Sequence, residues 1–324
     1  MSFSEDQFLQ GLFPRLGTMP SEVVVPPGDD CAAVRIAPGR FLLLAVDQVV
    51  GDRHYHLGSQ KASFENRHSK IENSPVPPPT PPELAGRKLL ARNLSDIAAM
   101  GGRPLYALVA GAFAPGQDAD WLNRFFDGLL ALGRDTGTVL IGGDLARAPH
   151  DAVASLTIVG EVAEDRIKLR SAAQPGDVLF VTGQLGSSFE TGHHLTFTPR
   201  LREGQWLAAQ CGVRAMMDIS DGLLPDAVRV CRASNCGLRI AAARLPLRTP
   251  QTTLEKALGD GEDYELLFSV APAAAAALAT AWPFPEVLLT RVGTFTAENS
   301  GRVIVTDTAD QELTLAVKGY DHFR

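Results

Sequence analysis

Apolar segments of two kinds alternate along the chain, and this alternation most limits the folds it can adopt. Some segments are short continuous aliphatic runs, such as residues 41–46 and 178–182, which favour buried strands. Others space apolar residues three and four positions apart, as in residues 83–100 and 118–133, which favours helices with one buried face. Because both kinds occur in each half of the chain, we expect an α/β protein with two mixed α/β domains.

The expected elements divide the chain near residue 165, and 324 residues suit two domains of ordinary size. We expect an N-terminal domain over residues 1–165 and a C-terminal domain over residues 166–324. Strands are expected at 41–46, 105–112, 138–141, 153–162, 178–182, 238–242, 264–270, 287–292 and 303–307. Helices are expected from residue 4 and near 83–100, 118–133, 203–211, 222–234 and 273–282. Residues 58–82 are polar, then dense in proline, and predict a mobile surface loop.

Charge and hydropathy exclude several classes of function. The formal net charge is −7, which makes the chain a poor candidate for binding nucleic acid. Its longest apolar runs are too short to cross a bilayer, so no membrane partner is expected. Residues 1–10 lack the basic and apolar regions of a signal peptide, and we therefore expect the cytoplasm as the location.

Aspartate, rather than a nucleophile, marks the segments that carry chemistry. The sequence has no P-loop, no G-x-G-x-x-G, no G-x-S-x-G and no H-E-x-x-H. Carboxylates instead recur at the ends of apolar segments, often beside glycine: Asp29, Asp30, Asp47, Asp96, Asp144, Asp218, Asp221, Glu262 and Asp263. Oxygen ligands of this kind suit Mg²⁺, and glycines let a backbone approach a phosphate. Together they predict a site for Mg²⁺ and a nucleotide.

Each carboxylate also has a purely structural interpretation. Asp-Gly and Gly-Asp pairs are common in turns. Asp96 could pair with Arg92 one helical turn earlier. Ser220 or Asp221 could cap the helix that follows. The metal-site hypothesis therefore rests on the set and not on any single residue.

The order of these segments resembles one known family. GDDCAAV, AVDQVV followed by His54, GRKLLARNLSDIAAMGG, IGGD, RSAAQPGDVLFVTGQLG, MDISDGLLPD, GDGEDYELLF and KGYDHF are similar to bacterial thiamine-monophosphate kinase. The wider superfamily includes aminoimidazole ribonucleotide synthetase and selenophosphate synthetase. The resemblance implies an N-terminal ATP-binding domain of the aminoimidazole ribonucleotide synthetase type that also dimerises, and a C-terminal α/β domain.

The resemblance also implies a reaction and its partners. ATP would pass its γ-phosphoryl group to thiamine monophosphate by direct in-line transfer, giving thiamine diphosphate. Mg²⁺ would be required, and the protein would be a homodimer. Because the acceptor phosphate is already ionised, catalysis reduces to charge neutralisation and positioning, and no catalytic side-chain nucleophile is expected.

Individual roles follow from the motif matches. The resemblance implies Mg²⁺ ligands at Asp30, Asp47, Asp96, Asp144, Asp218 and Asp221. It implies nucleotide contacts from Gly143, Asp144, Arg170 and Ser220, and contacts with thiamine monophosphate from His54, Glu262 and Val317. From spacing alone, His54 is better interpreted as an exposed loop histidine.

The chain departs from the family pattern beside these positions. Ala45 and Val46 stand where the family has hydroxyl residues before the aspartate, and Val317 stands where it has an aromatic residue. Two alternatives to the thiamine-monophosphate reaction remain. One is a kinase for another small phosphomonoester, and the other is a degenerate, non-catalytic nucleotide-binding relative.

Overall fold

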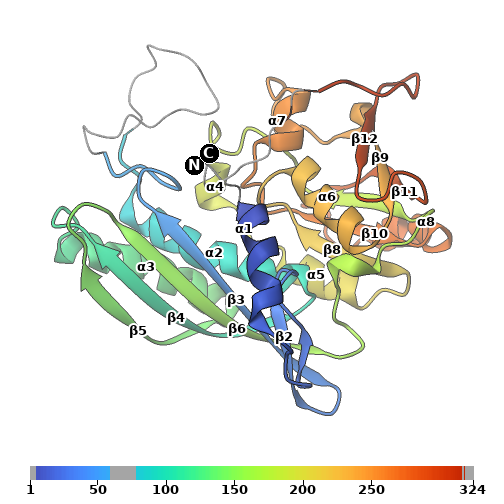
Figure 1. The fold of residues 1–324 in the computed structure, drawn as a ribbon. Coiled ribbons are helices and arrows are strands. Elements are labelled where there is room, and N and C mark those ends of the chain that lie inside the picture. Colours follow the sequence, from blue (N-terminus) through green and yellow to red (C-terminus); the bar gives the residue numbers. More distant parts are fainter. Residues whose placement is uncertain (1–4, 59–77, 316, 318–324) are drawn as a thin grey trace.

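The computed structural model describes residues 5–58, 78–315 and 317, so most of the loop expected at 58–82 lies outside the described residues. The described chain forms two six-stranded sheets, each accompanied by helices (Figure 1). The expected α/β class is therefore confirmed. No helix in the described ranges is long and apolar enough to cross a membrane.

The first sheet contains the six strands from residues 23 to 163, in the spatial order β1-β2-β3-β6-β4-β5. These strands are β1 (Val23–Val25), β2 (Ala32–Ala37), β3 (Arg40–Val50), β4 (Arg103–Phe113), β5 (Val139–Arg147) and β6 (Val153–Ala163). β4 and β5 run parallel, and the other neighbours run antiparallel. A short helix, α1 (Glu5–Leu12), and a 3-10 turn, Phe13–Leu16, precede the sheet.

Two helices, α2 (Pro82–Ala99) and α3 (Ala119–Thr136), cover one face of this sheet (Figure 1). Alternate residues of β6, from Ala154 to Val162, are buried toward these helices, as a half-covered strand requires. Helix α3 is amphipathic: it starts at an Asp118 side-chain cap and ends at Gly137 in the left-handed conformation.

Helix α2 is buried along most of its 18 residues because it is packed from two sides. It contacts α3, β3 and β6 of the first sheet, and also α4 (His193–Thr196), α5 (Leu201–Ala208) and β8 (Val213–Asp218) of the second half. Gly86 meets the backbone of α3 so closely that a Cβ there would lie 1.8 Å from Phe125 O. The helix thus lies in the core of the first sheet and also packs against elements of the second half.

The second sheet has the order β12-β9-β11-β7-β10-β8. Besides β8, its strands are β7 (Val178–Thr182), β9 (Gly237–Ala241), β10 (Leu266–Val270), β11 (Leu289–Thr296) and β12 (Val303–Thr306). Its further helices are α6 (Leu223–Ala233), α7 (Leu254–Gly259) and α8 (Pro272–Ala281), with 3-10 turns at Arg170–Ala172 and Ala242–Arg244.

The structure corrects three expected strand ends near functional candidates. Asp47 does not end β3, because pairing with β6 continues through Val50. Asp144 lies inside β5, which stays paired with β4 as far as Arg147. Glu262 precedes β10 instead of opening it, in a turn where it has the left-handed φ of 55°.

The face of the first sheet that points away from α2 carries exposed apolar side chains. The register places Val46 of β3 and Leu108 of β4 in one row across Thr157 of β6. Val46 is 65% exposed and Leu108 is 41% exposed, and Tyr106 and Val139 extend the apolar area. We call this surface the outer face.

Candidate active site

Three aspartates from distant parts of the sequence converge beside α2. Asp30 lies just before β2, Asp96 lies in the last turns of α2, and Asp218 is the last residue of β8. One carboxylate oxygen of each lies within 4.8 Å of those of the other two. We call these residues the acidic cluster. It joins segments from both halves of the chain.

Neighbouring groups hold the acidic cluster in place. The Ser95 hydroxyl donates to Asp218 Oδ2 at 2.6 Å. Arg170 Nη2 donates to Asp30 Oδ1 at 2.6 Å, and the Arg170 backbone N–H donates to Asp29 Oδ2 at 3.1 Å. Arg170 therefore reaches the cluster through Asp30.

Burial and mutual repulsion make the cluster a high-energy arrangement for carboxylates alone. Burial raises the pKa of Asp96 well above its usual value, and the charges of Asp47, Asp218 and Asp30 raise it further. Burial and the Asp30 charge likewise raise the pKa of Asp218. A divalent cation would relieve this repulsion, and three carboxylates at this spacing match the oxygen ligands of Mg²⁺. The donor set therefore fits the implied metal.

Asp47 lies next to the acidic cluster, but its carboxylate pairs with the guanidinium group of Arg92. Arg92 of α2 donates from Nε to Asp47 Oδ2 at 3.3 Å and from Nη1 to Gln48 O at 2.9 Å. The Asn93 side chain accepts from the Asp47 backbone N–H at 3.1 Å. The pairing of Arg92 with Asp96 is thus not formed, and Arg92 instead joins α2 to β3.

The structure does not bring Asp144 to the acidic cluster. Asp144 pairs with Ala110 of β4, and this row points to the outer face. Its neighbour Gly143 has a structural reason to be glycine, because a Cβ there would lie 2.0 Å from Val109 O. The metal and nucleotide roles of these two residues stay predictions.

Asp221 and Ser220 form a tight turn before α6, where a buried carboxylate replaces the expected cap. Asp226 Oδ2 accepts the backbone N–H groups of residues 220, 221 and 222 at 3.0–3.2 Å. Asp221 Oδ2 pairs with Arg229 Nη1 at 2.6 Å. The Ser220 and Asp221 side chains therefore do not cap the helix, and Asp221 lies outside the cluster of three.

Glu262 and His54 meet at a buried lysine. Lys88 of α2 is fully buried and donates to Glu262 Oε2, to the His54 carbonyl at 2.7 Å and to His194 Nδ1 at 2.9 Å. Although burial opposes ionisation of Glu262, the Lys88 charge, with help from His194, holds its pKa well below the usual range. His54 is only 2% exposed, so the interpretation as an exposed loop histidine is wrong.

The remaining predicted residue, Val317, is half-buried and packs against the apolar core of the second sheet. Sequence reasoning missed several supporting residues, namely Lys88, Arg92, Ser95, His194 and Asp226. Three of these belong to the motif GRKLLARNLSD, in which positions 88, 92, 95 and 96 share one side of a helix. That shared helix side was the sequence signal that could have identified Lys88, Arg92 and Ser95 as neighbours of Asp96.

The acidic cluster predicts a stability that depends on pH and on Mg²⁺ together. Groups with a raised pKa stabilise the fold while protonated, and that contribution is lost as the pH rises through the raised pKa. Burial also raises the pKa of Asp29, beside the cluster, to about 6, and that of Asp226, outside the cluster, to about 7. In EDTA we therefore expect the melting temperature to fall between pH 6 and pH 8. Mg²⁺ at ~100 times its Kd should restore about 2.7 kcal/mol at pH 8. A melting temperature that Mg²⁺ does not change at either pH would contradict a metal site.

Comparison with known proteins places the fold and site in a class. Residues 28–162 match the AIR synthase related protein N-terminal domain, and residues 174–306 match the corresponding C-terminal domain. The chain is thus a two-domain protein of the AIR synthase related class. Its curated relatives include the thiamine-monophosphate kinases of Escherichia coli strain K12 (33% identity, covering 100% of this chain and 99% of the relative) and of Bacillus subtilis (29%, 94% and 95%). The chain belongs to the thiamine-monophosphate kinase family.

Solved structures agree with this placement. The protein AaThiL, complexed with AMPPCP and TMP, is 25% identical, with a TM-score of 0.78 over 99% of this chain and 97% of that chain. The thiamine-monophosphate kinase of Stenotrophomonas maltophilia is 28% identical, with a TM-score of 0.66 over 94% and 97%.

Proposed function

We propose that this protein is a thiamine-phosphate kinase. It transfers the γ-phosphoryl group of ATP to the phosphate of thiamine monophosphate, and thiamine diphosphate is the product. Family membership over the whole chain supports this activity. The observation that carries the proposal is the acidic cluster, because its three carboxylates converge from segments far apart in sequence. Dependence on cellular ATP also makes the cytoplasm the expected location.

Asp30, Asp96 and Asp218 would hold Mg²⁺, with Asp47 beside them. When bound, Mg²⁺ neutralises charge on the phosphate oxygens and helps to align the two substrates. The protein itself supplies placement: Ser95 fixes the Asp218 carboxylate, and Arg170 presents a permanent, forked cation next to Asp30. The acceptor phosphate needs no strong base, which agrees with a site built from carboxylates and a guanidinium.

We place thiamine monophosphate near Glu262 and His54. Lys88 connects these two residues and keeps Glu262 ionised. An anionic carboxylate here suits a cationic organic substrate. The nucleotide would lie on the other side of the acidic cluster, near Arg170 and Ser220. The acidic cluster would then lie between the two anionic groups that react.

The outer face supports the proposed homodimer. Val46, Leu108 and Tyr106 expose apolar area on a sheet face that no helix of the described chain covers. A second copy packed face to face would bury this area, and it would also bring Asp144 to the boundary between the two protomers.

Analytical ultracentrifugation tests the proposed homodimer. We expect the wild type to sediment as a dimer and the Val46→Asp variant to sediment as a monomer.

The activity is tested by coupling ADP release to a spectrophotometric readout. We expect ADP release only when thiamine monophosphate and Mg²⁺ are both present, and none with EDTA. Thiamine, which lacks the acceptor phosphate, is the matched control. Release that occurs with other small phosphomonoesters but not with thiamine monophosphate would reassign the substrate. A folded protein that binds ATP without turnover on any acceptor would contradict the enzyme itself.

A further inference from the structure

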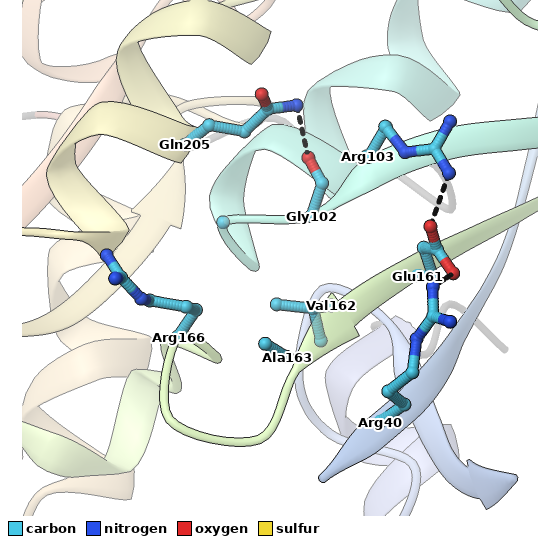
Figure 2. A pocket seen from close by; sticks show the side chains of 9 residues that line it. Arg40, Gly102, Arg103, Glu161, Val162, Ala163, Arg166 and Gln205 are labelled. Atoms are coloured by element: carbon cyan, nitrogen blue, oxygen red, sulfur yellow. Dashed lines mark hydrogen bonds and ion pairs between the residues drawn. The ribbon is translucent and has the colours of Figure 1, made fainter. Parts of the chain in front are cut away.

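A pocket of about 330 Å³ lies apart from the acidic cluster, where the two halves of the chain join (Figure 2). Its walls come from the first residue of β3, the start of β4, the end of β6, the segment after β6, and α5. Gln205 of α5 closes one side by donating to Gly102 O at 2.9 Å. The volume falls within the range of small-molecule sites.

The charges that line this pocket are mainly positive. Three arginines, Arg40, Arg103 and Arg166, line the pocket with one carboxylate, Glu161. Arg166 also pairs with Asp165 beside the pocket at 3.5 Å, which leaves an excess of one positive charge. The whole chain, by contrast, carries a formal net charge of −7. An excess of guanidinium groups in one pocket of an acidic protein favours an anionic ligand.

Glu161 arranges two of the guanidinium groups side by side. Arg40 and Arg103 each donate to it through a single nitrogen, Nη2, one to each carboxylate oxygen. Each guanidinium has five N–H donors, so both keep donors for a ligand. Arg166 lies on the opposite side of the pocket, and Val162 and Ala163 lie between the two sides (Figure 2). The pocket therefore presents cationic groups on two walls.

We propose that this pocket binds a small phosphate-bearing anion, with its phosphoryl oxygens between the Arg40–Arg103 wall and Arg166. Guanidinium forks match phosphoryl oxygens, and a phosphate carries more charge per group than a carboxylate. The proposal goes beyond the proposed kinase reaction, because no lining residue belongs to the acidic cluster or its supports. A ligand held here would contact both halves of the chain.

The test uses inorganic pyrophosphate and isothermal titration calorimetry on the full chain, in EDTA and at low salt. Without Mg²⁺, the probe cannot bind to the acidic cluster through a metal ion, which leaves the arginine pocket as its expected site. We expect the double variant Arg103→Gln/Arg166→Gln to weaken binding at least tenfold. We expect Glu161→Gln to tighten it, because one opposing charge is removed. Arg302→Gln is the matched control, since Arg302 is an exposed arginine paired with Glu312 elsewhere, and it should leave binding unchanged.

Other probes distinguish the sources of the phosphate. ADP and thiamine diphosphate are titrated in the same way, and tighter binding that the double variant abolishes would identify an organic phosphate as the ligand. The proposal is overturned if pyrophosphate does not bind, or if the double variant binds as the wild type does. It is also overturned if only Arg170→Gln abolishes binding, because the anion would then occupy the nucleotide side of the active site.

Discussion

Substituting Asp96 by asparagine is expected to lower turnover by ~10²–10³-fold, as loss of one charged contact in such a site typically does. The side chain keeps its shape but loses the charge that, in the proposed function, would hold Mg²⁺ together with Asp30 and Asp218. The same substitution should raise the melting temperature of the metal-free protein, because it removes a buried carboxylate whose pKa is already raised by burial and by like charges. Activity and stability are thus expected to change in opposite directions.

The measurement compares ADP release with thermal unfolding in EDTA. Asp127→Asn, an exposed aspartate within α3, is the matched control and should alter neither quantity by much. Turnover within a few-fold of wild type in Asp96→Asn would contradict the assignment of the acidic cluster. A melting temperature that falls in EDTA would show instead that the Asp96 carboxylate stabilises the metal-free fold.

Replacing Lys88 by methionine is expected to lower the free energy of unfolding by ~3–5 kcal/mol, the usual effect of removing one partner of a buried ion pair. Lys88 is fully buried, and its ammonium donates to Glu262, His194 and the His54 carbonyl. Methionine has nearly the same length but no charge. It would leave the Glu262 carboxylate buried without its cation.

Denaturant unfolding measures this loss, and a second variant separates its causes. Lys88→Met/Glu262→Gln removes both charges and should recover much of the lost stability. Arg124→Met is the control, because it breaks an exposed pair with Glu83 on the outside of the same helix pair, where ~0.2–1 kcal/mol is expected. If Lys88→Met and Arg124→Met lower the free energy of unfolding equally, the buried pair stabilises the fold no more than an exposed pair does. If Glu262 contacts thiamine monophosphate, the double variant should regain stability without regaining a normal KM for that substrate.

Much of the fold could be predicted, because its strands are buried and their residues are apolar. The strand expected at 178–182 has the observed bounds Val178–Thr182, and β6 differs from its expected range by a single residue. Errors arose where pairing in three dimensions outweighed local pattern. β3 continues through Asp47 and Gln48 because β6 pairs with it along its whole length. β1 has only three residues, and β2 contains Arg35, so neither carries a clear signal.

For the candidate site, the residue types were easier to predict than the question of which residues lie together in space. Sequence alone indicated a set of aspartates, but only the topology shows which of them meet. Asp30, Asp96 and Asp218 converge because the start of β2, the last turns of α2 and the end of β8 lie at the same place. Asp144 does not join them, because its side of β5 is decided by a register shift between Ala107 and Leu108 that no local pattern reveals. Lys88 was missed because one lysine in a helix usually lies at the surface.

Helix α2 has a consequence for how the two halves unfold. It packs against α3 and the first sheet on one side and against α5 and β8 on the other, so the core that surrounds it also includes Phe197, Leu201 and Tyr264 of the second half. Two domains joined only by a linker melt independently, whereas two that share a buried element lose their cores at the same moment. A single calorimetric transition follows for this chain, with equal van't Hoff and calorimetric enthalpies. An isolated C-terminal half would then be aggregation-prone, because the surface that α2 covers would be open to solvent.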